Sequence, residues 1–194
     1  MDDLNLLLPK LITTYDKNLI AQIYFGKSIH DNIFQKTINQ NIFKDILEYY
    51  TLHYPFSINK KIIYTYGDSK FQLGTTRKLY NCTQEYMHGN PSKLIANINT
   101  NLDLLLVTKK TIQKSNDKFT CIKEYHNIEE VENISIKIDE HIILNLDVND
   151  NQYNIYITIQ LLSDIKAYLT SISDVIQKIQ QIINKEDNIT YKLL

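Results

Sequence analysis

The sequence predicts an α+β fold, in which an antiparallel, strongly curved sheet or barrel of about seven to eight strands has a long helix near each end. Residues 152–160 alternate isoleucine with polar side chains, which is typical of a strand with one apolar and one polar face. Apolar residues recur every three or four positions over Asp31–Tyr50 and Ser163–Asn184, as in amphipathic helices. Short loops join most of the remaining apolar runs, which favours antiparallel neighbours.

The first elements are expected in the following order. A short helix is predicted over Leu4–Tyr15, and a strand over Asn18–Phe25 that ends at Gly26. The helix that follows, Asp31–Tyr50, is expected to take its N-cap from Ser28 or from Asp31 itself, because both side chains accept hydrogen bonds from free backbone N–H groups.

The middle of the chain predicts a hairpin that turns at Gly67-Asp68, then a short helix over Pro91–Asn99. The last helix, Ser163–Asn184, is followed by a short tail strand at Ile189–Leu193. The strands expected between the first and last helices alternate apolar and polar positions: Lys61–Tyr66, Lys70–Leu73, Leu102–Lys109, Lys118–Tyr125, Asn133–Ile138, His141–Val148 and Tyr153–Gln160. The turns expected between the later strands are Lys114–Asp117, Asp139-Glu140 and Asn149–Asn151.

Composition favours a single domain over residues 1–194, with a core at 18–184, an N-terminal segment at 1–17 and a C-terminal tail at 185–194. The formal net charge is −1, so no global attraction to nucleic acid or to an anionic membrane is expected. Cys82 and Cys121 are expected to be reduced thiols in a cytoplasmic protein. Abundant Ile, Asn, Lys and Tyr, with four glycines and no tryptophan, indicate an AT-rich genome such as that of a large DNA virus, a protozoan or a low-GC bacterium.

Common catalytic and metal-binding motifs are absent from the sequence. It has neither a Gly-x-x-x-x-Gly-Lys nor a Gly-x-Gly-x-x-Gly phosphate loop, and no Gly-x-Ser-x-Gly nucleophile motif. The five histidines are scattered without His-x-x-x-His spacing, so no metal site and no cofactor are expected. The acidic run Glu129, Glu130 and Glu132 is interpreted as a solvated loop. Basic residues near tyrosines, such as Lys118 and Lys123 beside Tyr125, leave contact with RNA as an alternative.

The order of the predicted strands resembles the triphosphate tunnel metalloenzyme fold, in particular the RNA 5′-triphosphatase module of capping enzymes from large DNA viruses. The resemblance covers about residues 18–184 and adds a tunnel-like barrel to the expected fold. Its segments are Leu19–Gly26 with the helix that follows, Ile62–Leu73, the paired runs Leu102–Lys110 and Lys118–His126, Ile142–Val148, and Tyr153–Leu161 with the last helix.

The resemblance also implies where a metal site would lie. In that family, glutamates of the first and last strands bind the divalent cation that neutralises the triphosphate. At those positions this chain has Ile20 and Gln22 in the first strand and Tyr156 and Thr158 in the last. Neutral groups do not compensate the dehydration of a divalent cation, so no catalytic residue is predicted. The residues expected to line the tunnel are Gln22, Tyr24, Lys109, Lys118, Lys123, Tyr156 and Thr158.

These features support the hypothesis of a non-catalytic accessory or interaction subunit of viral origin, linked to mRNA capping or transcription. We expect a protein partner, with RNA as a further candidate, no membrane, and a place in the host cytoplasm, a viral factory or the virion. One alternative is a structural or virion protein that acts by oligomerisation, since tyrosine is common at interfaces. Another is a metal-dependent RNA or NTP triphosphatase that takes acids from elsewhere, such as Glu124, Glu129 or Asp147.

Overall fold

The computed structural model describes residues 19–29, 33–66, 69–73, 79–84, 103–110, 127–160 and 168–190. Its strands are β1 (Leu19–Ile29), β2 (Ile33–Gln35), β3 (Phe56–Tyr66), β4 (Ser69–Leu73), β5 (Leu79–Gln84), β6 (Asp103–Lys110), β7 (Asn127–Lys137), β8 (Ile142–Asn149) and β9 (Gln152–Gln160). Its helices are α2 (Gln40–His53) and α3 (Leu169–Thr190). The segments expected at Leu4–Tyr15, Pro91–Asn99 and Lys118–Tyr125, and the turn at Lys114–Asp117, lie outside the described residues.

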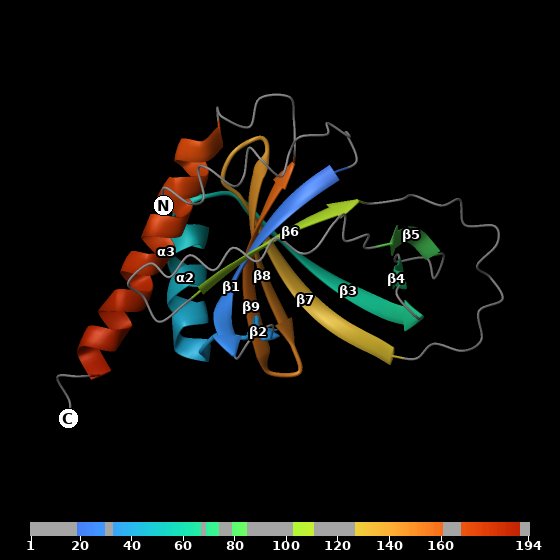
Figure 1. The fold of residues 1–194 in the computed structure, drawn as a ribbon, viewed down its shortest axis with the longest axis horizontal. Coiled ribbons are helices and arrows are strands. Elements are labelled where there is room, and N and C mark those ends of the chain that lie inside the picture. The colour runs from blue at the N-terminus through green and yellow to red at the C-terminus, as the bar shows by residue number, and fades with distance from the viewer. Residues whose placement is uncertain are drawn as a thin grey trace.

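The strands form one antiparallel sheet in the order β2-β1-β9-β8-β7-β3-β4-β5, and β6 pairs with β1 as well. Figure 1 shows the long strands twisting strongly across one another, with both helices on one side of the sheet. Within the described residues the sheet is not closed, because β5 and β6 each pair with a single strand. The predicted α+β class and strongly curved antiparallel sheet are confirmed.

The hydrophobic core lies between the helices and one face of the sheet. Every second residue of the central strands contributes to it, for instance Ile23 of β1, Leu144 of β8 and Ile157 of β9, each at most 1% exposed. From α3, Ile176 and Ile179 are fully buried against the same cluster. Alternate residues of the strands thus pack against one face of each helix: Ala21, Ile23 and Phe25 of β1, and Ile155, Ile157 and Ile159 of β9.

The first long helix starts later than the sequence predicts. Residues Ile33–Gln35 form β2, which pairs with the end of β1, and α2 begins only at Gln40. The N-cap is Asn39, whose Oδ1 accepts a hydrogen bond from Asn41 N at 2.7 Å, so Ser28 and Asp31 do not cap this helix. Ile33 and Phe34 fit the helical spacing of the apolar residues that follow, so the helix was predicted to include them, whereas they belong to β2.

Other boundaries also differ from the predictions. The first strand continues past Gly26 to Ile29, and α3 extends to Thr190 through the start of the expected tail strand. The acidic run that was interpreted as a loop belongs to β7, where Glu132 lies 3.9 Å from Lys60 Nζ of β3. The backbone of this acidic segment pairs with β3. The acidic side chains had suggested a loop and gave no sign of this pairing.

The turns predicted at Asp139-Glu140 and Asn149–Asn151 are confirmed, whereas Gly67-Asp68 lies outside the described residues. The β3–β4 hairpin pairs Tyr66 with Ser69, and β8 and β9 are joined at Asp150 and Asn151, with φ of 45° and 65°. Asp and Asn tolerate the left-handed conformation that such a tight hairpin requires. In the part of the chain that the structure describes, neither helix is both long and apolar enough to span a membrane.

We predict that Gly26→Ala destabilises the protein by about 3 kcal/mol, the upper range for forcing atoms into a packed site. A Cβ at Gly26 would overlap the carbonyl oxygen of Gln35 and lie 2.7 Å from Cε1 of Phe34. The free energy of unfolding in urea measures the effect, and Lys27→Ala, at the exposed neighbouring position, should change it little. Equal stability of the two variants would contradict the close approach of β2 to β1.

Candidate functional site

The face of the sheet opposite the helices carries polar side chains that the strand register brings together. In the β1–β9 ladder, Gln22 lies directly opposite Thr158, and Tyr24 lies opposite Tyr156. Gln22 and Tyr24 are 8% and 7% exposed, so they are nearly as buried as the core residues behind them. Three of the positions at which the resemblance implies acids, Gln22, Tyr156 and Thr158, are thus neighbours in the fold, and Gln22 is buried.

Thr158 joins three strands through its hydroxyl. Gln22 Nε2 of β1 donates to Thr158 Oγ1 at 3.3 Å, and Asn145 Nδ2 of β8 donates to the same oxygen at 3.0 Å. On the β1 side, the hydroxyl of Tyr24 donates to Gln22 Oε1 at 2.6 Å. Each buried amide therefore has a partner, which offsets the cost of removing it from water.

The same hydrogen-bond network continues into β7. Ser135 Oγ lies 3.1 Å from Asn145 Oδ1 and 2.7 Å from Asn133 Oδ1. Asn133 is 1% exposed, and its Nδ2 donates to Asp147 Oδ1 at 2.5 Å. We call the residues Gln22, Tyr24, Asn133, Ser135, Asn145, Asp147 and Thr158 the polar network; it crosses β1, β9, β8 and β7.

Aromatic rings and a lysine border the polar network at β1. Tyr24 and Tyr156 stack with ring centroids 5.0 Å apart and planes inclined by 29°. Lys36 Nζ lies 3.9 Å from the centroid of the Tyr24 ring, within the range of a cation–π contact. The ammonium group of Lys36 is thus directed at the ring of Tyr24.

The donor set of the polar network does not fit a hard divalent cation. Mg²⁺ and Mn²⁺ are held by carboxylates and other oxygen ligands that replace bound water. Here the oxygens of Gln22 and Thr158 already accept hydrogen bonds from neighbouring side chains, and Asp147 is the network's single carboxylate. Within the described residues, no group of three or more His, Cys, Asp or Glu is placed to hold a metal ion.

The predicted lining residues are only partly described. Gln22, Tyr24, Tyr156 and Thr158 lie together on the polar face. Lys109 lies opposite Ile20 in the β1–β6 ladder, whereas Lys118 and Lys123 lie outside the described residues. A role in lining a tunnel remains a prediction for all of them.

Three members of the polar network were not predicted from the sequence, and a fourth was predicted to have a different role. Asn133, Ser135 and Asn145 alternate with Ile134, Ile136, Leu144 and Leu146, which is the pattern that identified the polar face of β9. Asp147 was considered as a catalytic acid of a rival hypothesis. The alternation was present in the sequence, but only the register of β7 with β8 brings these side chains together.

No protein-family model and no curated protein sequence match this chain. Solved structures do match. The RNA triphosphatase Pct1 of S. pombe is 10% identical, with a TM-score of 0.60 over 96% of this chain and 89% of that chain. The Mimivirus capping enzyme triphosphatase is 14% identical, with a TM-score of 0.57 over 92% of this chain and 96% of that chain. The predicted resemblance to the triphosphate tunnel fold is therefore confirmed, at the level of the fold.

We predict that Thr158→Val destabilises the protein by about 2 kcal/mol, because the amides of Gln22 and Asn145 lose a shared acceptor. Thr158→Ser keeps the hydroxyl and should cost less than about 1 kcal/mol. Chemical unfolding of both variants provides the measurement. A valine variant as stable as the serine variant would mean that the polar network contributes nothing to folding.

Proposed function

We propose that this chain is a pseudoenzyme with the triphosphate tunnel fold, an accessory or interaction subunit of viral origin that works beside an mRNA-capping or transcription machine. The observation that carries the proposal is the Gln22–Thr158 and Tyr24–Tyr156 pairing. Gln22, Tyr156 and Thr158 are at acidic positions of the resembling family; here Gln22 hydrogen-bonds to Thr158, and the ring of Tyr156 stacks on that of Tyr24. Pct1 and the Mimivirus capping enzyme domain, which share the fold, are RNA triphosphatases, and this supports the link to capping.

A protein partner is part of the proposal. Pct1 has been solved in complex with the Spt5 CTD, with a TM-score of 0.59 to this chain, so one protein of this fold combines with a protein segment. We propose that this chain does so too, in the host cytoplasm, a viral factory or the virion. RNA is a secondary candidate, and a membrane is not expected.

The main rival is a metal-dependent triphosphatase that uses Asp147. The observation in its favour is the position of this carboxylate on the polar face, beside the buried Asn133. A structural role through oligomerisation is a second rival, since Phe56 and Ile58 of β3 are exposed apolar residues.

We predict that the purified chain releases no phosphate from triphosphate-ended RNA or from NTP in the presence of Mg²⁺ or Mn²⁺. The assay measures released phosphate against a background without protein, with Asp147→Asn as the paired variant. The Mimivirus capping enzyme triphosphatase, assayed in parallel, shows that the substrate and metal are competent.

Metal-dependent release that disappears in Asp147→Asn would overturn the non-catalytic proposal and support the first rival. To separate the second rival, light scattering gives the oligomeric state of the purified chain. A stable oligomer that dissociates in Phe56→Ser/Ile58→Ser would favour it.

A further inference from the structure

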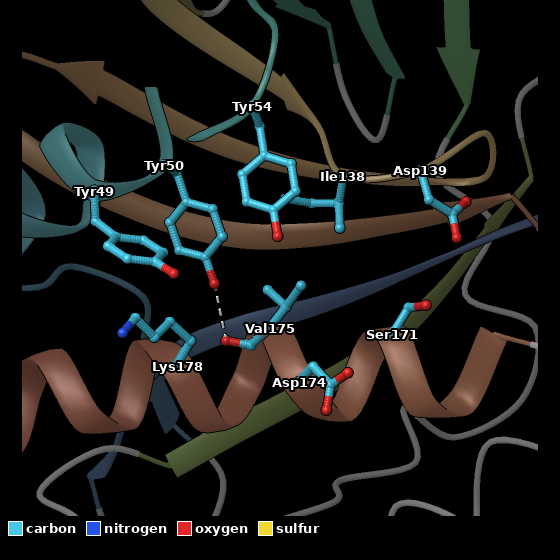
Figure 2. Close-up of a pocket in the computed structure, with 9 residues that line it drawn as sticks. All are labelled: Tyr49, Tyr50, Tyr54, Ile138, Asp139, Ser171, Asp174, Val175 and Lys178. Carbon is cyan, nitrogen blue, oxygen red and sulfur yellow. Dashed lines mark hydrogen bonds between the residues drawn. The ribbon is translucent and has the colours of Figure 1, made fainter. Parts of the chain in front are cut away.

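A pocket of about 290 Å³ lies on the helix side of the sheet, away from the polar network. It is formed where the end of α2 and the β7–β8 turn meet α3 (Figure 2). Its lining combines tyrosines, aspartates and a lysine with small and apolar groups: Tyr49, Tyr50, Tyr54, Ile138, Asp139, Ser171, Asp174, Val175 and Lys178. We call it the tyrosine pocket.

The aromatic wall of the tyrosine pocket is held rigidly. Tyr50 is 1% exposed, and its hydroxyl donates to the backbone carbonyl of Val175 at 3.2 Å, which joins α2 to α3. Burial, with smaller contributions from Tyr54 and Tyr49, raises the pKa of the Tyr50 hydroxyl, which therefore stays neutral. The ring of Tyr54 stacks on that of Tyr50, with centroids 5.7 Å apart. A ligand would thus meet ordered rings, of which Tyr49 and Tyr54 are partly exposed.

The charges of the tyrosine pocket are separated along α3. Lys178 Nζ lies 4.3 Å from the centroid of the Tyr49 ring, so this cation already has a partner. Asp174 comes one turn before Lys178 on α3 and Ser171 two turns before it, and Figure 2 shows Asp139 towards that end of the pocket. Asp139 Oδ1 accepts from His141 N at 2.8 Å. Within the described part of the chain neither aspartate has an ion-pair partner, so the uncommitted charge of the pocket is negative.

An exposed apolar strip begins beside the pocket. Phe56 and Ile58 of β3 are 51% and 57% exposed. They pair with Ile136 and Ile134, and therefore share the face of the sheet that the helices cover elsewhere. Phe56 follows Tyr54 by two residues, so the strip extends the surface around the pocket along β3. Such a strip beside a charged pocket fits a peptide with apolar side chains near its charged one.

We propose that the tyrosine pocket binds an arginine side chain of a protein partner. A guanidinium is planar, stacks on an aromatic ring and pairs with carboxylates through several N–H donors. The partly exposed ring of Tyr54 and the carboxylates of Asp139 and Asp174 supply both kinds of contact, and the volume suits a long, slender side chain. The inference rests on the proposed interaction role and names the chemistry that the partner brings.

The probes for the test are three capped pentapeptides: Leu-Gly-Arg-Gly-Leu, the same peptide with citrulline in place of arginine, and Gly-Gly-Arg-Gly-Gly. Citrulline keeps the shape of arginine and removes its charge. Each peptide is titrated into the ¹⁵N-labelled full chain, and backbone amide shifts give the dissociation constant. We expect saturable shifts around Ile138, Ser171 and Val175 with the arginine peptides, and binding about tenfold weaker with citrulline.

Variants of the chain connect the binding to the pocket. Asp139→Asn/Asp174→Asn should weaken arginine binding about tenfold, and the asparagine that replaces Asp139 keeps an Oδ1 acceptor for His141 N. The matched control is Asp45→Asn, which removes one charge from an exposed position of α2 outside the pocket. Phe56→Ser/Ile58→Ser should remove the advantage of the leucine peptide over the glycine peptide.

The inference is overturned if citrulline binds as well as arginine, if the double aspartate variant binds unchanged, or if no arginine peptide saturates. It is also overturned if a uridine oligonucleotide, but no peptide, shifts the same amides. If the peptides do not bind, the non-catalytic proposal still stands, because the phosphate-release assay tests it separately. Conversely, metal-dependent hydrolysis would overturn the non-catalytic proposal whatever the peptides do.

Discussion

The register of β1 against β9 is the constraint on which the rest of the structure depends. It places Ile23 opposite Ile157 on the helix side and Gln22 opposite Thr158 on the polar side. Because side chains alternate along a strand, a slip of one residue would turn the polar residues into the hydrophobic core. Both the helix packing and the polar network therefore rely on one alignment between strands far apart in sequence.

The polar network differs from a site that binds a charged ligand in where its hydrogen-bonding groups are directed. A catalytic or metal site holds donors and acceptors that are aimed at a group to be bound, and this arrangement commonly costs stability. Here Gln22, Asn145 and Asn133 are bonded to side chains of neighbouring strands. With one carboxylate among neutral groups, the polar network is stabilised by contacts within the chain and contains no like-charge repulsion that a cation must relieve.

The sequence predicted those parts of the fold in which local pattern and final environment agree. The alternation at residues 152–160 identified β9, and Asp150 with Asn151 marked the β8–β9 hairpin. The start of α2 was missed, because Ile33 and Phe34 fit a helical period while pairing with β1. In the candidate site, Gln22 and Thr158 were identified through resemblance, whereas Asn133 and Ser135 needed the pairing of β7 with β8, which no local signal specifies.

The hydrogen bond from Gln22 to Thr158 spans 136 positions of the chain. During synthesis on the ribosome, β1 emerges long before β9 exists, since a chain grows by about 5–20 residues per second. For roughly ten seconds β1 has available only the partners made earlier, β2 and then β6. Its buried amide and the apolar side chains behind it are exposed to other molecules during that interval. Completion of the central sheet thus waits for β9, and until then the first strand lacks the partner that covers its polar side chains.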